Sequence, residues 1–385
     1  MMCYSGIMRR FFKNIHLWLS LPFGIVMSVT CFTGAILIFE KEITESVQSD
    51  YYFVDSVADQ RLPMTEVMTL AEGHLAEGQR ITGVVISADP ERCYKVNLSE
   101  PKRAAIYVDQ YSGEVKGQPE RLTFFAVMFR LHRWLMDTRP EDGGIYWGKV
   151  VVGISTLVMV VVLITGIFIW VPKSFRMWRN RSTIAVRKGW RRFWYDLHVA
   201  GGIYAVLLLL AMSLTGLTWS FKWYNKGFNW LFGVETADAA PAKSGDVRGK
   251  HSVDISPYAH WDDVYNSVAD ELEHPADITL SQGKVSVKLS GWGNPRAADN
   301  YNFDNDSGEV LSVDRYADTD RRSKLRGWVY GVHVGNWGGI LTRVMWFLAA
   351  LLGATLPLTG YYIWIKRVLC KHHKCDFKEC PHRQH

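Results

Sequence analysis

Residues 16–39, HLWLSLPFGIVMSVTCFTGAILIF, align without gaps on residues 198–221, HVAGGIYAVLLLLAMSLTGLTWSF, 182 positions further along the chain. Each stretch begins with a histidine and continues as an uncharged apolar run. A helix of about 20 apolar residues is long enough to cross the hydrocarbon core of a bilayer. The sequence therefore predicts two related membrane-spanning helices, each with a histidine at its start.

Four uncharged apolar runs of this length occur in the 385 residues, at 17–39 (TM1), 150–171 (TM2), 197–221 with its apolar core from 199 (TM3), and 344–365 (TM4). They predict four transmembrane helices and exclude a simple soluble enzyme. No small-residue cleavage site follows the first run before Glu40, so we expect it to remain as an anchor rather than to be removed as a signal peptide.

Basic residues flank these runs unevenly. The connection 172–192 carries eight Lys and Arg and no acid, and three more basic residues precede the first run. The positive-inside rule places such segments in the cytoplasm. We therefore expect residues 1–16, the loop 172–192 and the tail 366–385 to be cytoplasmic. The net charge of +6 is then a consequence of topology, and no nucleic-acid partner is needed to explain it.

Residues 40–144 and 222–343 are then expected on the other side of the membrane. Each segment has a stretch of helical periodicity followed by short alternating runs, and each ends its hairpin in DxxSGEV, at Asp109 and at Asp304. These patterns predict two small α+β modules, the first with an additional interfacial helix. Cys93 is the only cysteine of the two segments, so no disulfide is expected within either of them.

The second and fourth runs also repeat, because both carry TGxxxW, beginning at Thr165 and at Thr359. Repeats that agree in both order and spacing indicate a tandem duplication. Each half then consists of a span, an external module and a second span, in the same membrane orientation. Two helices from each half predict a four-helix transmembrane bundle.

A hairpin module ending in DxxSGEV, placed between spans that carry LHRWL and TGxxxW, resembles the PepSY-associated transmembrane family over nearly the whole chain. Some members of this family resemble haem proteins of the bacterial inner membrane that reduce ferric siderophores on the periplasmic side. The resemblance implies periplasmic PepSY-like modules and a haem-dependent ferric-siderophore reductase. Other members have no assigned activity, which leaves a second reading: a non-enzymatic protein that binds peptide or modulates a periplasmic protease or receptor.

His16 and His198 occupy matched positions at the cytoplasmic ends of the first and third spans. Gly34 and Gly216 lie 18 residues further on, which is five helical turns, and so share a stripe with these histidines. Small residues on a stripe allow close helix packing or leave room for a flat cofactor. Facing imidazoles are suitable axial ligands, so we predict an inner haem b between His16 and His198. The alternative is a pair of interfacial histidines that cap helices or bind lipid headgroups.

His132 and His333 form a second matched pair, each shortly before the outer end of a span. We predict that they ligate an outer haem b. His132 lies in an amphipathic segment that is expected on the outer membrane surface. The alternative for this pair is an aromatic collar at the membrane interface, where tryptophan is common.

Two stacked haems would carry electrons across the bilayer to Fe(III) held in a periplasmic chelate. Reduction favours iron release because hard oxygen ligands bind Fe(II) less tightly than Fe(III). The chain has no dinucleotide, Walker or hydrolase motif, so the electron donor is expected to be a cytosolic partner or the quinone pool. A transporter is less favoured, because the four apolar runs contain no Asp, Glu, Lys or Arg.

The tail is rich in cysteine and histidine. Its Cys370, Cys375, Cys380 and His382 suit Zn(II) or Fe(II) in a reducing compartment. However, the cysteine spacing differs from the usual CxxC motif, and a disordered basic tail is as well supported.

Overall fold

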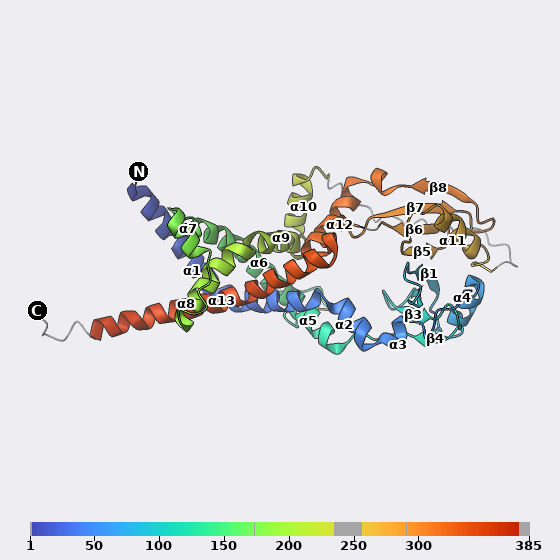
Figure 1. Cartoon of the computed structure of the whole chain (residues 1–385), viewed down its shortest axis with the longest axis horizontal. Helices are drawn as coiled ribbons and strands as arrows, with labels where there is room; N and C mark the ends of the chain where they lie inside the picture. Colours follow the sequence, from blue (N-terminus) through green and yellow to red (C-terminus); the bar gives the residue numbers. More distant parts are fainter. Residues whose placement is uncertain (1, 173, 235–255, 290, 377–385) are drawn as a thin grey trace, which may run out of the picture. The chain divides into compact units, whose positions relative to one another are not determined.

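The computed structural model describes residues 2–172, 174–234, 256–289 and 291–376, without the side chains of residues 2–6 and 370–376. The chain divides into two compact units (Figure 1). The helical unit comprises Met1–Phe39, Thr123–Phe228 and Val332–His385, and the sheet unit comprises Glu40–Leu122 and Asn229–Gly331. The predicted tail site of Cys370, Cys375, Cys380 and His382 lies entirely outside the described side chains.

Four helices of the helical unit are long and apolar enough to cross a membrane, which confirms the prediction of four spans. They are α1 (Met2–Leu37), α6 (Trp147–Trp170), the run from α8 (Trp190–Asp196) through a π-helical turn (Leu197–Gly201) into α9 (Gly202–Ser220), and α13 (Gly339–Asp376). The chain is therefore a multi-pass membrane protein. Helices α1 and α13 extend well beyond the apolar runs, into stretches that contain charged residues.

The four long helices form a closed ring of contacts. Helix α1 packs against α6 and α13, and α9 packs against the same two helices. Small and aliphatic side chains fill the centre, among them Leu163, Ala205, Leu209 and Ala349. This is the predicted four-helix bundle.

Helix α5 (Thr123–Trp134), predicted as an amphipathic interfacial helix of the first external module, belongs to the helical unit. It packs against α1 and α6, and Phe125 is only 1% exposed. Residues from Thr123 onward therefore belong to the helical unit, whereas the sequence placed them in the first external module up to residue 144. The amphipathic pattern arises here because one helix face is buried against the bundle.

The remaining helices are short. They are α2 (Glu40–Val47), α3 (Ser49–Tyr52), α4 (Met64–Glu72), α7 (Phe175–Arg181), α10 (Lys222–Leu231), α11 (Trp261–Asp270) and α12 (Arg321–Val334), with 3-10 turns at Tyr316–Asp318 and Asn336–Gly338. Helix α12 carries His333 in its last turn.

The sheet unit contains one antiparallel sheet of eight strands in the order β4-β3-β2-β1-β5-β6-β7-β8. The strands are β1 (Ile81–Ile86), β2 (Tyr94–Leu98), β3 (Ala105–Val108), β4 (Val115–Gly117), β5 (Ile278–Ser281), β6 (Lys284–Lys288), β7 (Ala298–Phe303) and β8 (Val310–Asp314). Each predicted external segment contributes four strands and one helix that packs on the sheet, α4 or α11, consistent with the predicted α+β plan.

The two predicted modules are not separate, because β1 of the first pairs with β5 of the second. The seam aligns Val84 with Leu280 and Ile86 with Ile278. Side chains of α4, α11 and both halves of the sheet form one hydrophobic cluster. Pairing at the seam satisfies backbone N–H and C=O groups that two isolated modules would leave at exposed edges. This correction reduces the two predicted domains to a single α+β unit.

Candidate functional site

His16 of α1 docks onto the neighbouring helix α6. Its Nδ1 atom lies 3.0 Å from the carbonyl oxygen of Val162 and 3.2 Å from Oγ1 of Thr165. Gly166 completes the contact, since a Cβ atom at this glycine would lie 3.5 Å from Cε1 of His16. The ring therefore packs against the consecutive residues Thr165 and Gly166 of the adjacent span.

His198 makes the equivalent contact in the other half of the bundle. Its Nδ1 atom lies 3.0 Å from the carbonyl oxygen of Leu356 and 2.9 Å from Oγ1 of Thr359, both on α13. A Cβ atom at Gly360 would lie 3.4 Å from Cε1 of His198. His198 itself lies in the π-helical turn before α9. Such turns are rare and occur frequently at functional sites.

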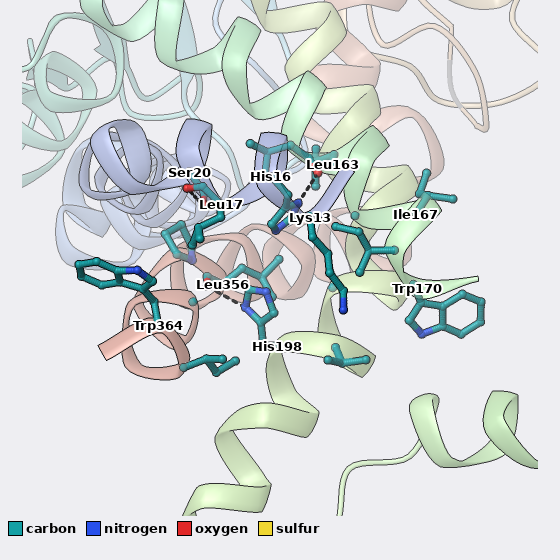
Figure 2. Close-up of a pocket in the computed structure, with 18 of the residues that line it drawn as sticks. Lys13, His16, Leu17, Ser20, Leu163, Ile167, Trp170, His198, Leu356 and Trp364 are labelled. Atoms are coloured by element: carbon teal, nitrogen blue, oxygen red, sulfur yellow. Dashed lines mark hydrogen bonds between the residues drawn. The ribbon is translucent and has the colours of Figure 1, made fainter. Parts of the chain in front are cut away.

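These two histidines form the first pair. Their ring centroids are 6.2 Å apart, with the ring planes at 88°. Figure 2 shows the two rings on opposite sides of the space between the helices, each with one nitrogen in a dashed hydrogen bond that leads away from the other ring. The sequence prediction that His16 and His198 lie close together therefore agrees with the structure.

His132 and His333 form the second pair, with ring centroids 6.1 Å apart and planes at 56°. Nδ1 of His132 lies 2.9 Å from the carbonyl oxygen of Thr30 on α1, and Nδ1 of His333 lies 2.9 Å from that of Met212 on α9. The Trp219 ring stands edge-on to His333 at 5.0 Å. The structure thus also brings together the histidines of the predicted outer site.

Gly34 and Gly216 have a different role from the one predicted. A Cβ atom at Gly34 would lie 2.8 Å from Cε1 of His132, and one at Gly216 would lie 3.0 Å from Cε1 of His333. These glycines therefore make room for the second pair, although the sequence placed them on the stripe of His16 and His198. A side chain at Gly34 would force the His132 ring to move, and one at Gly216 would crowd the His333 ring.

One rule describes all four histidines. Each Nδ1 atom bonds the carbonyl oxygen four residues before a glycine of a neighbouring span, and each ring packs on that glycine. Sequence analysis missed this role for Gly166 and Gly360. The available signal was a Thr-Gly step in every span, at residues 33–34, 165–166, 215–216 and 359–360.

The carbonyl partner determines which ring nitrogen carries the proton. A carbonyl oxygen only accepts hydrogen bonds, so a neutral imidazole bonded to it must hold its N–H at Nδ1. The lone pair is then on Nε2, which is the arrangement found in histidine ligands of metal ions. The bonds also run to neighbouring helices and not to the histidines' own helix ends, which disfavours helix capping.

A cavity of about 740 Å³ surrounds the first pair (Figure 2). Besides the two histidines, its walls are mainly aliphatic, with Met27, Leu163, Val206 and Leu356 among the lining residues. Cavities of about 300–1,000 Å³ with apolar walls and a few polar groups are typical of cofactor sites. The arrangement suits a large flat apolar group that needs two nitrogen ligands.

The fold and these sites define a multi-pass membrane protein with two pairs of half-buried, oriented imidazoles and an antiparallel α+β unit. The chain belongs to the family described as the PepSY-associated TM region, whose model matches residues 13–367. The match includes all four histidines and both halves of the sheet. None of the curated proteins matches the sequence significantly.

Proposed function

We propose that the protein is a haem oxidoreductase of the bacterial inner membrane. It binds two b-type haems, passes electrons outward across the bilayer, and reduces a ferric chelate such as a ferric siderophore in the periplasm. The observation that carries this proposal is the pair of matched imidazole arrangements, with centroid separations of 6.2 and 6.1 Å and every Nδ1 atom bonded to a carbonyl.

The spacing of the rings supports axial ligation. Metal–nitrogen distances to imidazole are about 2 Å, and a ring centroid lies about 1 Å behind the ligating nitrogen. Two imidazoles on opposite sides of one iron therefore have centroids about 6 Å apart, close to both separations in this protein. Haem iron already has four porphyrin nitrogens, so two axial imidazoles complete its coordination.

The hydrogen bonds at Nδ1 provide orientation and tuning. A carbonyl acceptor fixes the tautomer and the ring angle, and it makes the opposite nitrogen a stronger donor to iron. The ligands of each pair come from different helices, for example His132 from α5 and His333 from α12. Ligation would therefore tie the two halves of the bundle together at two levels.

The two levels are separated by most of the bilayer. His16 and Gly34, the glycine beneath His132, are 18 residues apart on α1, which corresponds to about 27 Å along a helix. The hydrocarbon core is about 30 Å thick. When bound, the haems would supply one-electron chemistry, with one Fe(III) of the chelate reduced to Fe(II) for each electron delivered from a cytosolic or quinone donor.

The direct test is a single-turnover reaction with the detergent-purified protein. The protein is reduced with a stoichiometric amount of dithionite and mixed anaerobically with a ferric chelate in the presence of an Fe(II)-specific chromophore. The proposal predicts that the reduced Soret band reverts to the oxidised form while Fe(II) appears in equal amount. A reduced band that persists with every ferric chelate tried would contradict it.

A second function is supported by the edge strand β8, which pairs only with β7 among the described residues. In edge strand β8, Leu311 is 66% exposed and Val313 is 40% exposed. Such an edge can add a peptide as a further strand, which fits a non-enzymatic protein that binds peptide or modulates a protease or receptor. This function does not require haem, so haem content separates the two.

A further inference from the structure

The cavity of the first pair opens among basic side chains. Five of its described lining residues are cationic, and no Asp or Glu is among them. These residues, here called the basic rim, are Arg9, Arg10, Lys13, Arg181 and Arg367. Like charges around one opening repel each other, and an entering anion removes this repulsion.

Two arginines of the basic rim converge on the end of α6. Nη2 of Arg9 donates to the carbonyl oxygen of Ile169 at 2.6 Å, and Nη1 of Arg181 donates to that of Trp170 at 2.6 Å. The carbonyl end of a helix carries partial negative charge, so it holds both guanidinium groups in place. Each group has five donors, which leaves several for another acceptor.

Arg9 has a donor that the protein does not satisfy. Its Nε atom is buried and has no hydrogen-bond partner among the described residues. A buried N–H without an acceptor costs about 1–3 kcal/mol, so an acceptor supplied by a ligand would stabilise the site. This orphaned donor is an observation independent of the rim's charge.

Lys13 connects the basic rim to the histidines. It lies three residues before His16, so the two side chains share one face of α1. Figure 2 shows Lys13 beside the His16 ring on the wall of the cavity. A group held by His16 therefore has a cation next to it, on the side toward Arg9.

We propose that the basic rim binds the two propionate carboxylates of the haem held by His16 and His198, and that Arg9 and Lys13 are the principal anchors. This inference rests on the proposed function. The macrocycle occupies the aliphatic part of the cavity, and its carboxylate edge faces the rim. Charge-assisted hydrogen bonds from guanidinium and ammonium groups are about twice as strong as neutral ones. The rim thus selects a flat dianion and fixes its orientation.

The test compares haem with its dimethyl ester, which has the same ring and iron but no carboxylates. Haem-free protein in detergent is titrated with each porphyrin, and binding is followed by the Soret band. A His132→Ala variant removes the second site, so that only the first is measured. We expect the ester to bind about tenfold or more weakly than haem.

The variant Arg9→Gln/Lys13→Gln should reduce haem affinity toward that of the ester and leave the ester unaffected. The matched control is Arg187→Gln/Lys188→Gln, which removes the same charge from residues that do not line the cavity, and it should keep the full preference for haem. Circular dichroism on each variant checks that the bundle is folded.

The outcomes separate this inference from the proposed function. Equal affinity for haem and ester, or an unchanged preference in the Arg9→Gln/Lys13→Gln variant, would overturn the propionate assignment while leaving haem binding intact. A rim that served only lipid phosphate would give the same equal affinities, together with altered binding of phosphatidylglycerol vesicles by the variant. If neither porphyrin binds, the proposed function fails as well.

Discussion

The Nδ1 atom of His198 lies 3.0 Å from the carbonyl oxygen of Leu356, although the two residues are 158 positions apart. Gly360 lies beneath the His198 ring. The other three histidines make the same kind of contact, each with a carbonyl oxygen and a glycine of a neighbouring span. This recurrence means that each imidazole is positioned by a neighbouring span and is ready to bind a ligand through Nε2.

Removal of one histidine of the first pair should remove one haem. We expect His16→Ala and His198→Ala each to lower the pyridine haemochrome count from two haems per chain to one, because each variant removes one of the two proposed axial ligands of the first haem. The control is His74→Ala, an exposed histidine of the sheet unit, which should keep both haems. An unchanged haem count in His16→Ala or His198→Ala would show that this pair does not ligate a haem.

Glycine replacements should affect the two pairs differently. Gly34→Ala would place a Cβ atom 2.8 Å from Cε1 of His132, which is closer than packed atoms allow, and Gly216→Ala would place one 3.0 Å from Cε1 of His333, so that this ring must shift slightly. We expect a shifted Soret band or partial loss of the second haem, with a destabilisation of about 1–3 kcal/mol.

The matched controls for these glycines lie at the first pair. Gly166→Ala and Gly360→Ala place Cβ atoms at 3.5 and 3.4 Å, where contact is ordinary. These variants should therefore retain both haems with nearly unchanged spectra. Equal damage at all four glycines would show that the contact distances do not determine the effect.

The second pair should be required for delivery of electrons. We expect His333→Ala to abolish reduction of an added ferric chelate while dithionite still reduces the haem of the first pair. The measurement is Fe(II) formation together with the reduced-minus-oxidised spectrum. If His333→Ala reduces the chelate at the wild-type rate, electrons do not reach the chelate through the second pair, and the proposed order of transfer is wrong.

The seam of the sheet should be sensitive at Gly83. A Cβ atom there would collide with the carbonyl oxygen of Leu280 on β5. We expect Gly83→Ala to destabilise the sheet unit by about 1–3 kcal/mol and to lower its thermal unfolding midpoint. The haem spectrum should not change.

Gly73→Ala is the control for the seam, because its nearest contact is 3.5 Å away and its backbone is in the right-handed helical region. This variant should be neutral or slightly stabilised. If Gly83→Ala unfolds at the same temperature as wild type, the two halves do not depend on their shared seam.

Much of the bundle was predictable because its signals are local. The length of each apolar run can be read directly from the sequence. The repeat of His16 at His198 places these two histidines at the same level of the membrane without any knowledge of packing. The α+β plan of the external segments follows from alternation and turn residues in the same way.

The remaining features depend on contacts between distant parts of the chain. The seam between Val84 and Leu280 joins two segments that each look complete in sequence. The packing of α5 on α1 and α6 was not predictable either, because an amphipathic pattern does not identify the element that its apolar face contacts. The role of Gly34 was misread for a related reason: a helical stripe identifies which residues share a face, but not which side chain from another helix fills it.

The most direct test is the low-temperature electron paramagnetic resonance spectrum of the oxidised, purified protein. The account predicts two low-spin ferric haem signals, one for each imidazole pair, because two axial imidazoles impose a strong ligand field. The signal of the first pair should be the more anisotropic, since its rings are closer to perpendicular, at 88° against 56°. High-spin iron, or a protein without any haem signal after expression with ample haem, would contradict the account.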